Sequence, residues 1–405
     1  MMHFKLTILS FFMFPMLVFG QWEEKSISTP STLTSVKFYN NDLGFTVGGS
    51  NIYKTNNRGD TWELSFTGNS SVFLEDIFII EAGKAIAIGK DFNTEKSIIV
   101  RTGNNGITWN SINASNSALL RSVYFPTSNV GYCSGGNGSI LKSIDSGNSW
   151  QALSSGTSQN LQSIFFVDEL NGIAVGGSPS SSIVLKTTDG GENWNEVSTP
   201  SDKNLQSVYF VSQQVGYIVG WNGEIMKTMD GGNTWTPQTS VAMSGNLEVF
   251  FTNANTGYIV GGNLNESLIQ KTNNGGALWE DISPNINQGL VSIHFPSFST
   301  GYAVGENGTV LKTTSGGVTS TTQEIVHSPD IVTYPNPVVE YLSMRSIEPV
   351  IIESVKMYDS NGDFIYQAAV NASSGRINFS TLEANNYFLV IQTNEGLFVK
   401  KILKI

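Results

Sequence analysis

Short runs of apolar, β-branched and aromatic residues alternate with turns rich in Gly, Asn, Asp and Ser along most of this chain. Such runs are typical of short antiparallel strands joined by tight turns. One arrangement of four runs recurs seven times between residues 33 and 317. The third copy shows it clearly, with Leu120-Arg-Ser-Val-Tyr-Phe125, Gly131-Tyr-Cys-Ser-Gly135, Ile140-Leu-Lys-Ser143 and then Asp145-Ser-Gly147 before Trp150. The pattern therefore predicts an all-β fold that is built from repeats.

Six tryptophans mark the ends of the repeats. They are spaced 41 to 47 residues apart, at Trp62, Trp109, Trp150, Trp194, Trp235 and Trp279. A unit of about 40–45 residues that contains four strands is one blade of a β-propeller. Seven such units predict a seven-bladed propeller over residues 21–317.

The seventh copy lacks its last strand. It begins at Leu290 and reaches Gly317, but no Trp follows. The segment Gln21-Trp-Glu-Glu-Lys-Ser-Ile27 resembles Thr61-Trp-Glu-Leu-Ser-Phe66, which is the fourth strand of the first copy. We therefore predict that residues 21–28 supply the missing strand, so that the N-terminal strand closes the ring and leaves no open edge.

The turn between the second and third strands alternates along the chain. Copies three, five and seven carry Asn137-Gly138, Asn222-Gly223 and Asn307-Gly308, which favour tight type I′ hairpins. Copies two, four and six carry longer linkers at this point, and there we expect longer loops over residues 91–96, 178–182 and 263–267.

Residues 1–20 have the features of a secretory signal peptide. Lys5 precedes an apolar run from Leu6 to Phe19, and cleavage after Gly20 would leave Gln21 as the mature N-terminus. The run is shorter than the ~20 residues that span a bilayer, and no later segment is apolar for long enough. We expect an exported protein whose mature chain has no membrane span.

A turn of the form [Ser/Thr]-x-[Asp/Asn]-x-Gly precedes each repeat-end Trp. Its acidic or amide residue is Asp145, Asp189, Asp230, Asn57, Asn104 or Asn274. A short carboxylate or amide accepts hydrogen bonds from backbone N–H groups of its own turn. These residues are therefore predicted to be structural. The turns resemble the Asp-box of neuraminidase-type repeats.

The Asp-box resemblance implies an alternative function, because propellers with such turns also occur in sialidases and xyloglucanases. A secreted carbohydrate-active hydrolase would need two carboxylates across the central channel. Glu75, Asp76, Glu224 and Glu306 are candidates, but the sequence singles out no pair. Box residues repeat in six blades, whereas a catalytic residue belongs to one. We therefore predict no catalytic residue and a protein that is not an enzyme.

The complete repeat resembles that of the photosystem II stability/assembly-factor family. The resemblance covers residues 21–317 and rests on Leu205-Gln-Ser-Val-Tyr-Phe210, Gly216-Tyr-Ile-Val-Gly220, Ile225-Met-Lys-Thr228 and Asp230-Gly-Gly232 before Trp235. Members of this family in plants and cyanobacteria are seven-bladed propellers that help to assemble photosystem II. The resemblance implies the fold; the C-terminal segment indicates a cell of a different kind.

A polar linker over residues 318–330 leads to a different pattern over residues 331–405. Short alternating runs there predict a small immunoglobulin-like β-sandwich. The order of Tyr334-Pro-Asn-Pro337, Tyr358-Asp, Ile377 to Leu382, Tyr387 to Ile391 and a terminal Lys-Lys-Ile strand resembles the C-terminal sorting domain of type IX secretion. The resemblance implies export across the periplasm and outer membrane of a Gram-negative bacterium, with the secretion machinery as a partner and the product secreted or held at the cell surface. Ala384-Asn-Asn386 stands before Tyr387, where the family usually has Gly; because Asn tolerates the left-handed conformation, this departure does not weaken the resemblance.

Composition excludes several other classes of protein. Lys and Arg total 22 against 33 Asp and Glu, a net charge of −11, so no basic excess is present for nucleic acid or an anionic membrane. One Cys and three His exclude a disulfide framework and leave too few ligands for a Cys- or His-based metal centre. We expect no metal, no cofactor, no nucleic-acid partner and a monomer.

The ligand is predicted to bind the propeller face that carries the turns between strands two and three. The opposite face, with the boxes, is repetitive. The residue directly after each Val-Gly element varies, and Lys90, Trp221 and Glu306 depart most clearly from the Gly that is usual there. Trp221 suits stacking on a sugar or anchoring of a protein. The sequence therefore predicts a secreted, non-catalytic propeller that binds a protein or a glycan at the cell surface.

Overall fold

The computed structural model describes residues 22–114, 116–241, 244–263, 266–317, 331–346, 351–359, 364–393 and 396–405. Within these ranges the helical segments are three single 3₁₀ turns, η1 (Gly136–Gly138), η2 (Trp221–Gly223) and η3 (Glu306–Gly308), and all other regular structure is β-strand. No helix in the described ranges is long and apolar enough to cross a membrane. The predicted signal peptide and linker lie outside the described residues.

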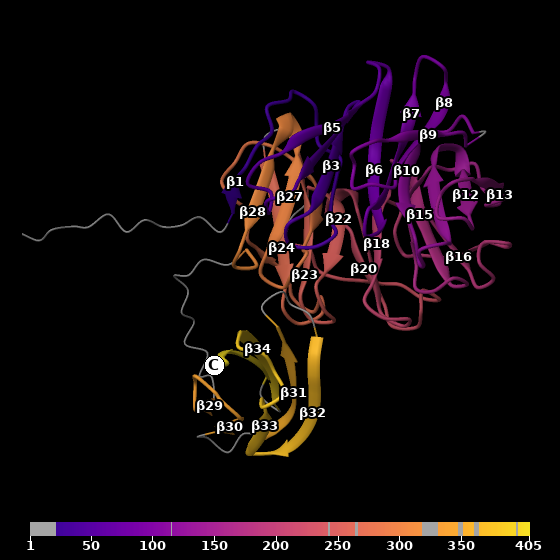
Figure 1. Cartoon of the computed structure of the whole chain (residues 1–405). Helices are drawn as coiled ribbons and strands as arrows, with labels where there is room; N and C mark the ends of the chain where they lie inside the picture. Colours follow the sequence, from indigo (N-terminus) through magenta and orange to yellow (C-terminus); the bar gives the residue numbers. More distant parts are fainter. Residues whose placement is uncertain are drawn as a thin grey trace, which may run out of the picture.

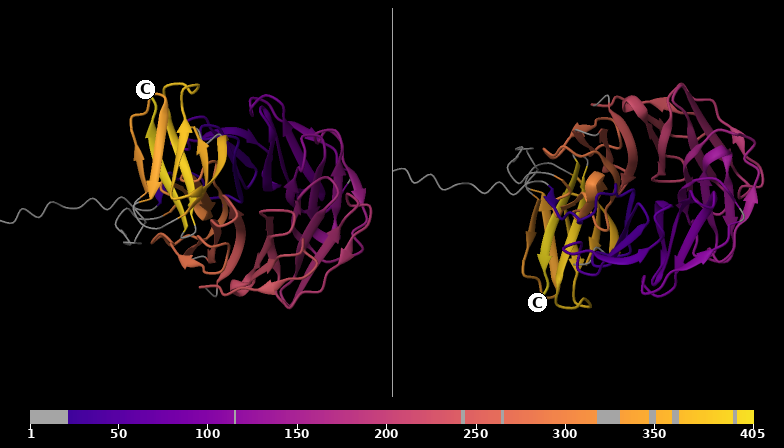
Figure 2. Two further views of the ribbon diagram at one scale, coloured as in Figure 1. Left: turned by 90° about the horizontal axis from the view of Figure 1, so that it is seen from below. Right: turned by 90° about the horizontal axis from the view of Figure 1, so that it is seen from above.

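Seven four-stranded antiparallel sheets follow one another along the chain, and each is one blade (Figure 1). Blade 1 contains β2 (Ser35–Phe38), β3 (Gly44–Gly48), β4 (Asn51–Thr55) and β5 (Glu63–Thr67); blade 2 contains β6 (Val72–Glu81), β7 (Lys84–Asp91), β8 (Lys96–Thr102) and β9 (Asn110–Ile112); blade 3 contains β10 (Leu120–Tyr124), β11 (Gly131–Gly135), β12 (Ile140–Ser143) and β13 (Gln151–Leu153). Blade 4 contains β14 (Leu161–Phe166), β15 (Gly172–Ser178), β16 (Ser181–Thr187) and β17 (Asn195–Glu196); blade 5 contains β18 (Leu205–Phe210), β19 (Gly216–Gly220), β20 (Ile225–Thr228) and β21 (Thr236–Pro237); blade 6 contains β22 (Gly245–Phe251), β23 (Gly257–Asn263), β24 (Glu266–Thr272) and β25 (Glu280–Asp281). The blades succeed one another around a ring in sequence order (Figure 2).

Blade 7 is completed by the N-terminal strand, as predicted. It contains β26 (Leu290–His294), β27 (Gly301–Gly305), β28 (Val310–Thr313) and, on its outer edge, β1 (Glu23–Glu24). The pairing extends past β1, because Lys25 N–H donates to the carbonyl of Val310 at 2.7 Å and Ile27 N–H to that of Gly308 at 2.9 Å. Trp22 is buried and packs edge-on against Phe295 with ring centroids 6.2 Å apart. The first and last parts of the propeller sequence therefore share one sheet.

The Asn-Gly hairpins have the predicted geometry. Asn137, Asn222 and Asn307 have φ of 55°, 58° and 53°, and the Gly after each also has positive φ. Two successive residues of positive φ define a type I′ turn, which Asn and Gly tolerate best. The longer loops expected in blades 2, 4 and 6 are largely absent: the two strands instead continue, with Asp91 paired to Lys96 and Ser178 paired to Ser181. In these blades the second and third strands are therefore longer, and the turn between them remains short.

The hydrophobic cores lie between neighbouring blades. One of them joins Val175 and Val184 of blade 4 to Leu205, Val208 and Phe210 of blade 5, all of them buried. Alternate residues of each strand face the next blade, which explains the apolar pattern of the repeat. The first strands β10, β14, β18 and β26 carry a bulge at their second residue, and β22 carries the equivalent bulge at its third residue, Leu247. These first strands contact one another and surround the axis of the ring.

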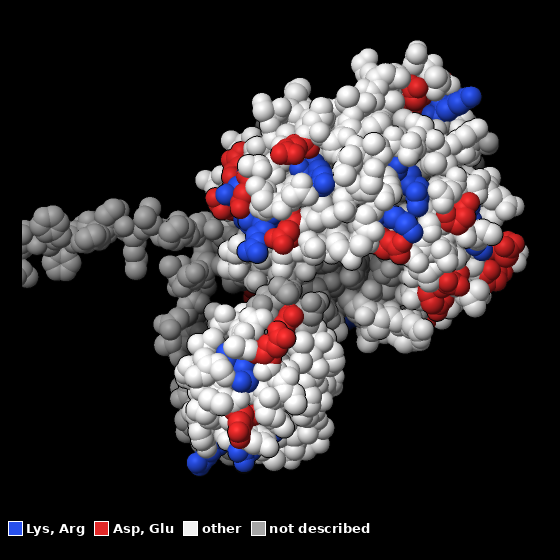
Figure 3. Space-filling model, viewed as in Figure 1, with Lys and Arg blue, Asp and Glu red and all other residues white. Residues whose placement is uncertain are grey.

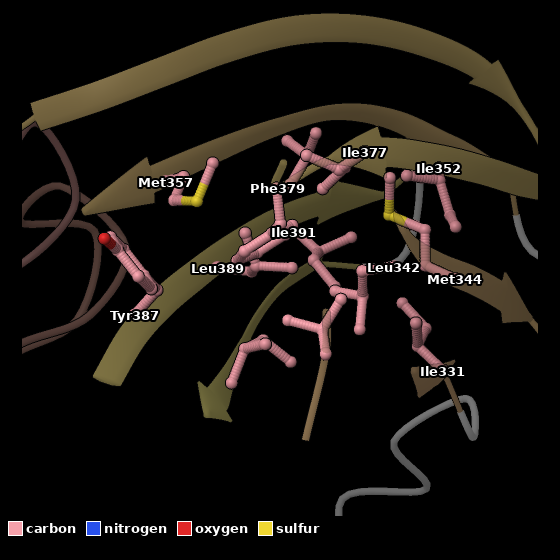
Figure 4. Packing of buried hydrophobic residues seen from close by; sticks show 13 residues of the cluster. Ile331, Leu342, Met344, Ile352, Met357, Ile377, Phe379, Tyr387, Leu389 and Ile391 are labelled. Atoms are coloured by element: carbon pink, nitrogen blue, oxygen red, sulfur yellow. The ribbon is translucent and has the colours of Figure 1, made fainter. Parts of the chain in front are cut away.

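The C-terminal residues form a separate β-sandwich. One sheet contains β29 (Ile331–Tyr334), β30 (Tyr341–Ser346) and β33 (Ser374–Asn378); the other contains β32 (Phe364–Ala372), β31 (Ile352–Tyr358), β34 (Asn386–Thr393) and β35 (Gly396–Leu403). Leu342, Met344, Leu389 and Ile391 are fully buried among thirteen core residues between the two sheets (Figure 4). Asn385, before Tyr387, does not use the left-handed conformation that Asn tolerates: its φ is negative, and it exchanges two backbone hydrogen bonds with Lys404.

Candidate functional sites of the propeller

Each Asp-box turn is closed by its own side chains. Asp230 Oδ1 accepts the hydroxyl of Thr228 at 2.8 Å and the N–H of Thr234 at 2.9 Å, and its Oδ2 accepts the hydroxyl of Thr234 at 2.6 Å. The bonds from Thr234, with those from Thr228 and the backbone of Asn233, lower the pKa of Asp230 to about 2. Asn57, Asn104 and Asn274 make the equivalent bonds with amide oxygens. This geometry supports a structural role for the boxes, because their acceptors are already occupied.

Neighbouring blades are locked together beneath the boxes. Tyr217 of blade 5 donates its hydroxyl to the carbonyl of Gly275, in the box of blade 6, at 2.8 Å, and Lys227 donates to the same carbonyl at 2.7 Å. The equivalent tyrosines, with their acceptors, are Tyr132 with Gly190, Tyr258 with Gly316 and Tyr302 with Arg58. Burial of the phenol raises the pKa of Tyr217 to about 12. A buried hydroxyl that finds a partner makes each junction specific as well as tight.

A belt of side-chain hydrogen bonds runs around the central axis. The third residue of each first strand's Leu-x-Ser motif accepts the backbone N–H of the next blade: Ser122 accepts from Ile164, Ser163 from Val208, Ser207 from Val249 and Ser292 from Val36. Acidic residues take this position in blades 2 and 6, where Asp76 accepts the N–H of Val123 and Glu248 that of Ile293. Blade 1 joins the belt through Ser35, whose hydroxyl donates to Asp76 at 2.7 Å.

Aromatic side chains form a collar next to this belt. Consecutive ring centroids lie 4.5 to 5.4 Å apart in the series Phe78, Tyr124, Phe165, Tyr209, Phe250 and His294. Each belongs to a different blade, so the collar covers six of the seven. His294 behaves as a member of the collar, since burial lowers its pKa to about 3 and keeps the ring neutral. It therefore occupies the position that Tyr or Phe holds in five other blades.

The seventh position of the collar is Lys37 of blade 1. Its ammonium lies 2.8 Å from Glu248 Oε1 of blade 6, and both side chains are about four-fifths buried, with exposures of 20% and 22%. Burial lowers the pKa of Lys37, but the charges of Glu248 and Asp76 outweigh this and the net shift is upward. Burial raises the pKa of Asp76, and Lys37 opposes that rise. One cation is therefore balanced by two carboxylates from blades 2 and 6.

The carboxylates suggested for hydrolase chemistry are engaged in the fold. Asp76 receives three donors, and Glu75 pairs with Arg121 at 3.3 Å. Glu306 accepts the N–H of Gly289 at 3.1 Å, and burial raises the pKa of Glu224, a rise that its hydrogen bond with Ser201 partly opposes. The structure brings Glu75 and Asp76 together on β6 and leaves Glu224 and Glu306 at the hairpins of blades 5 and 7. In the described part of the chain, no group of three His, Cys, Asp or Glu is placed to hold a metal ion.

The three predicted ligand residues lie on the hairpin face but in separate blades. Trp221 begins the hairpin turn of blade 5 and is 41% exposed. Lys90, in blade 2, pairs with Glu95 at 2.5 Å and lies 5.4 Å from the ring of Phe92. Glu306 begins the turn of blade 7. No hydrogen bond or ion pair joins the three within the described ranges, and only Trp221 presents a large apolar surface to solvent.

Charged side chains are scattered over the face of the molecule in Figure 3. Lys and Arg lie among Asp and Glu there, and this view shows no broad basic patch. Asp76 was predicted from the sequence only as a candidate catalytic acid, and Lys37, Glu248 and the collar were not predicted. A signal existed, because Lys37 stands where the other repeats carry an aromatic ring.

Two family models match parts of the chain. Residues 187–285 match the family described as photosynthesis system II assembly factor YCF48, and residues 332–405 match the secretion system C-terminal sorting domain. No similar curated protein is found by sequence. The predicted resemblances to both families are confirmed, and the sorting domain indicates a secreted or cell-surface protein.

Solved structures of similar shape are propellers. YCF48 from Cyanidioschyzon merolae has a TM-score of 0.59 at 18% identity, over 72% of this chain and 98% of that one. YCF48 bound to D1 peptide gives 0.60 at 18% identity, over 74% and 98%, and the WD40 repeats of RRP9 give 0.59 at 9% identity, over 73% and 97%. At such identities the likeness establishes the propeller fold alone.

Proposed function

We propose that this chain, whose propeller resembles YCF48 and whose C-terminus is a sorting domain, is a secreted, non-catalytic protein that binds a protein or a glycan at the cell surface. The type IX machinery would recognise residues 331–405 and export the chain through the periplasm and outer membrane. The domain boundaries at residues 20, 317 and 330 belong to the same proposal. The sorting domain carries the argument for export, and the engaged carboxylates support the non-catalytic role.

Binding is expected on the hairpin face, with Trp221 at its centre. An exposed Trp on a tight turn offers a rigid ring at small cost in conformational entropy, and such residues often dominate binding energy. A related propeller has been solved with a bound peptide, which supports a protein partner. Lys90 and Glu306 would lie at the edge of the contact, because Lys90 already pairs with Glu95 of its own hairpin and Glu306 already accepts the N–H of Gly289 in its own blade.

The test is binding of the full mature chain to an array of glycans and outer-membrane proteins. Trp221→Ala should weaken binding by at least tenfold and leave the melting temperature unchanged. Ile144→Ala is the matched control, because Ile144 is also apolar and exposed but lies on the box face. Normal binding by Trp221→Ala would contradict this surface. Release of sugar from the same glycans would contradict the non-catalytic role.

A further inference from the structure

The junction between blades 4 and 5 lacks the tyrosine and lysine contacts with the next blade's box carbonyl that join the blades at the neighbouring junctions. At four other junctions a tyrosine ring stacks on the Phe at or directly after the end of the next blade's first strand, with centroids 3.7 to 4.2 Å apart. Blade 4 carries Ile173 at the tyrosine position. A Cβ added to Gly232 would lie 2.9 Å from Ile173 Cδ1, and a Cβ added to the equivalent Gly276 would lie 2.8 Å from Tyr217 Cε1. Ile173 Cδ1 therefore extends about as far toward the next blade as the edge of the Tyr217 ring does. Nothing in Ile173 corresponds to the rest of the ring or to its hydroxyl.

The lysine at this junction, Lys186, also does not reach the box carbonyl of the following blade. Lys142, Lys227 and Lys271 donate to the box carbonyl of the following blade. Lys186, the equivalent in blade 4, instead donates to the side chain of Asn233 at 2.8 Å, on the surface. Among the described residues, no donor reaches the carbonyl of Gly231, which is the equivalent acceptor. Burial lowers the pKa of Lys186, opposed by the charge of Asp230.

The other two junctions that lack the tyrosine are filled in different ways. Blade 1 carries Phe45, which supplies a ring and packs edge-on against Trp109. Blade 2 carries Ile86, but Arg101 replaces the lysine there and its Nε donates to the carbonyl of Ser146 at 2.9 Å. In the described part of the propeller, only the junction of blades 4 and 5 has neither a ring nor a cation on the box carbonyl.

A cavity of about 270 Å³ opens at this point on the box face. Ile173 and Phe210 are buried and Phe165 is half-buried, so they form its floor, while Gln213, Gln214 and Asn233 are exposed and form its rim. Its volume is below the ~300–1,000 Å³ of sites for drug-sized ligands. It therefore suits one side chain rather than a larger molecule.

We propose that this cavity binds the phenol ring of a tyrosine from a partner peptide. The ring would lie over Ile173 against Phe210, and its hydroxyl would donate to the free carbonyl of Gly231. Lys186 would turn toward the ring, as Lys142, Lys227 and Lys271 lie 5.4 to 5.6 Å from the tyrosine rings of their own blades. The four junctions that contain a tyrosine therefore show the ring stacking and hydroxyl bond that we propose for the bound tyrosine. This site lies on the face opposite Trp221 and goes beyond the proposed function.

The test uses 4-methylphenol, which is the tyrosine side chain in isolation, titrated into the full mature chain with ligand-observed NMR. Toluene should bind at least fivefold more weakly, because it cannot donate to the Gly231 carbonyl. Ile173→Tyr should fill the cavity from within, abolish binding of 4-methylphenol and raise the melting temperature. Leu170→Tyr is the matched control, since it adds a tyrosine to an exposed position of the same blade, and it should bind as the wild type does.

Lys186→Met gives a second arm that does not depend on the folding of Ile173→Tyr. Loss of the cation should weaken binding of 4-methylphenol and of toluene by a similar factor, about threefold, because both molecules present an aromatic ring to Lys186. Equal affinity for 4-methylphenol and toluene would overturn the proposal. Retained binding in folded Ile173→Tyr would do the same, and so would preference for methyl glucoside over 4-methylphenol. Because Trp221→Ala leaves this cavity intact, failure here is distinguishable from failure on the hairpin face.

Discussion

Replacement of Lys37 by Met should reveal how far the propeller depends on one cation near its axis. The change removes the partner of Glu248 and leaves the charge of Asp76 unbalanced. Loss of one partner from a buried pair costs about 3–5 kcal/mol. Since Lys37 and Glu248 are about one-fifth exposed, we expect the lower end, about 3 kcal/mol at pH 8. In a propeller of this size that corresponds to a fall of about 6 °C in melting temperature.

The loss should depend on pH with a definite sign. Burial holds the pKa of Asp76 above its ordinary value, and without Lys37 it should rise further. A carboxyl whose pKa is higher in the folded state stabilises the fold below its unfolded pKa and loses that contribution as the pH rises through the folded pKa. The variant should therefore be closest to the wild type at pH 5 and furthest from it at pH 8. The raised pKa of Lys37 in the wild type affects stability only above about pH 10.

Urea unfolding followed by tryptophan fluorescence is the assay. All eight tryptophans lie between Trp22 and Trp279, so the signal reports the propeller and not the sorting domain. Lys84→Met is the control, because its pair with Glu81 is exposed and is worth less than about 1 kcal/mol. The double variant Lys37→Met with Glu248→Gln should recover most of the loss. The proposed role of Lys37 would be refuted if the difference in unfolding free energy between Lys37→Met and the wild type grew toward pH 5. It would also be refuted if the variant were as stable as the wild type at pH 8.

Two further predictions concern ring closure and export. Trp22→Ala should cost about 3 kcal/mol, as other large buried aromatics do, and a chain that begins at residue 29 should aggregate; melting like the full chain would rule out closure by the N-terminal strand. Removal of residues 331–405 should leave the propeller folded and hold it in the periplasm of its native host, so its appearance at the cell surface, detected by protease accessibility, would contradict the sorting assignment.

Features that repeat could be predicted from the sequence. The period of the tryptophans predicted the blades, and the likeness of residues 21–27 to the end of the first copy predicted the pairing of β1 with β28. Both rest on local patterns that each blade satisfies by itself. The Asn-Gly turns were predictable for the same reason, because the conformation at Asn222 depends on two residues only.

Features that join distant blades could not be predicted in the same way. Lys37 and Glu248 are separated by 211 residues and by blade 7, so no sequence spacing connects them. The sequence showed a lysine where other copies have a ring, but its partner depends on how the ring closes. The cavity at Ile173 was missed for another reason. A tyrosine-to-isoleucine change looks conservative within a core, and its consequence becomes visible only beside the carbonyl of Gly231.

The departures from the repeat fall into two groups that differ in how they are compensated. Lys37 is balanced by Asp76 and Glu248, Arg101 satisfies the carbonyl that a tyrosine would have reached, and Lys90 pairs with Glu95. Such positions are complete within the chain and need no ligand. Ile173 leaves a cavity and a free acceptor, and Trp221 leaves an exposed ring. Since buried polar groups and large apolar surfaces are costly when unpaired, a partner gains most by contact at the second group. Lys90 and Trp221 were both predicted as ligand residues because each departs from the Gly that is usual at that position. They differ in the structure, because Lys90 is already paired with Glu95 and Trp221 leaves its ring exposed.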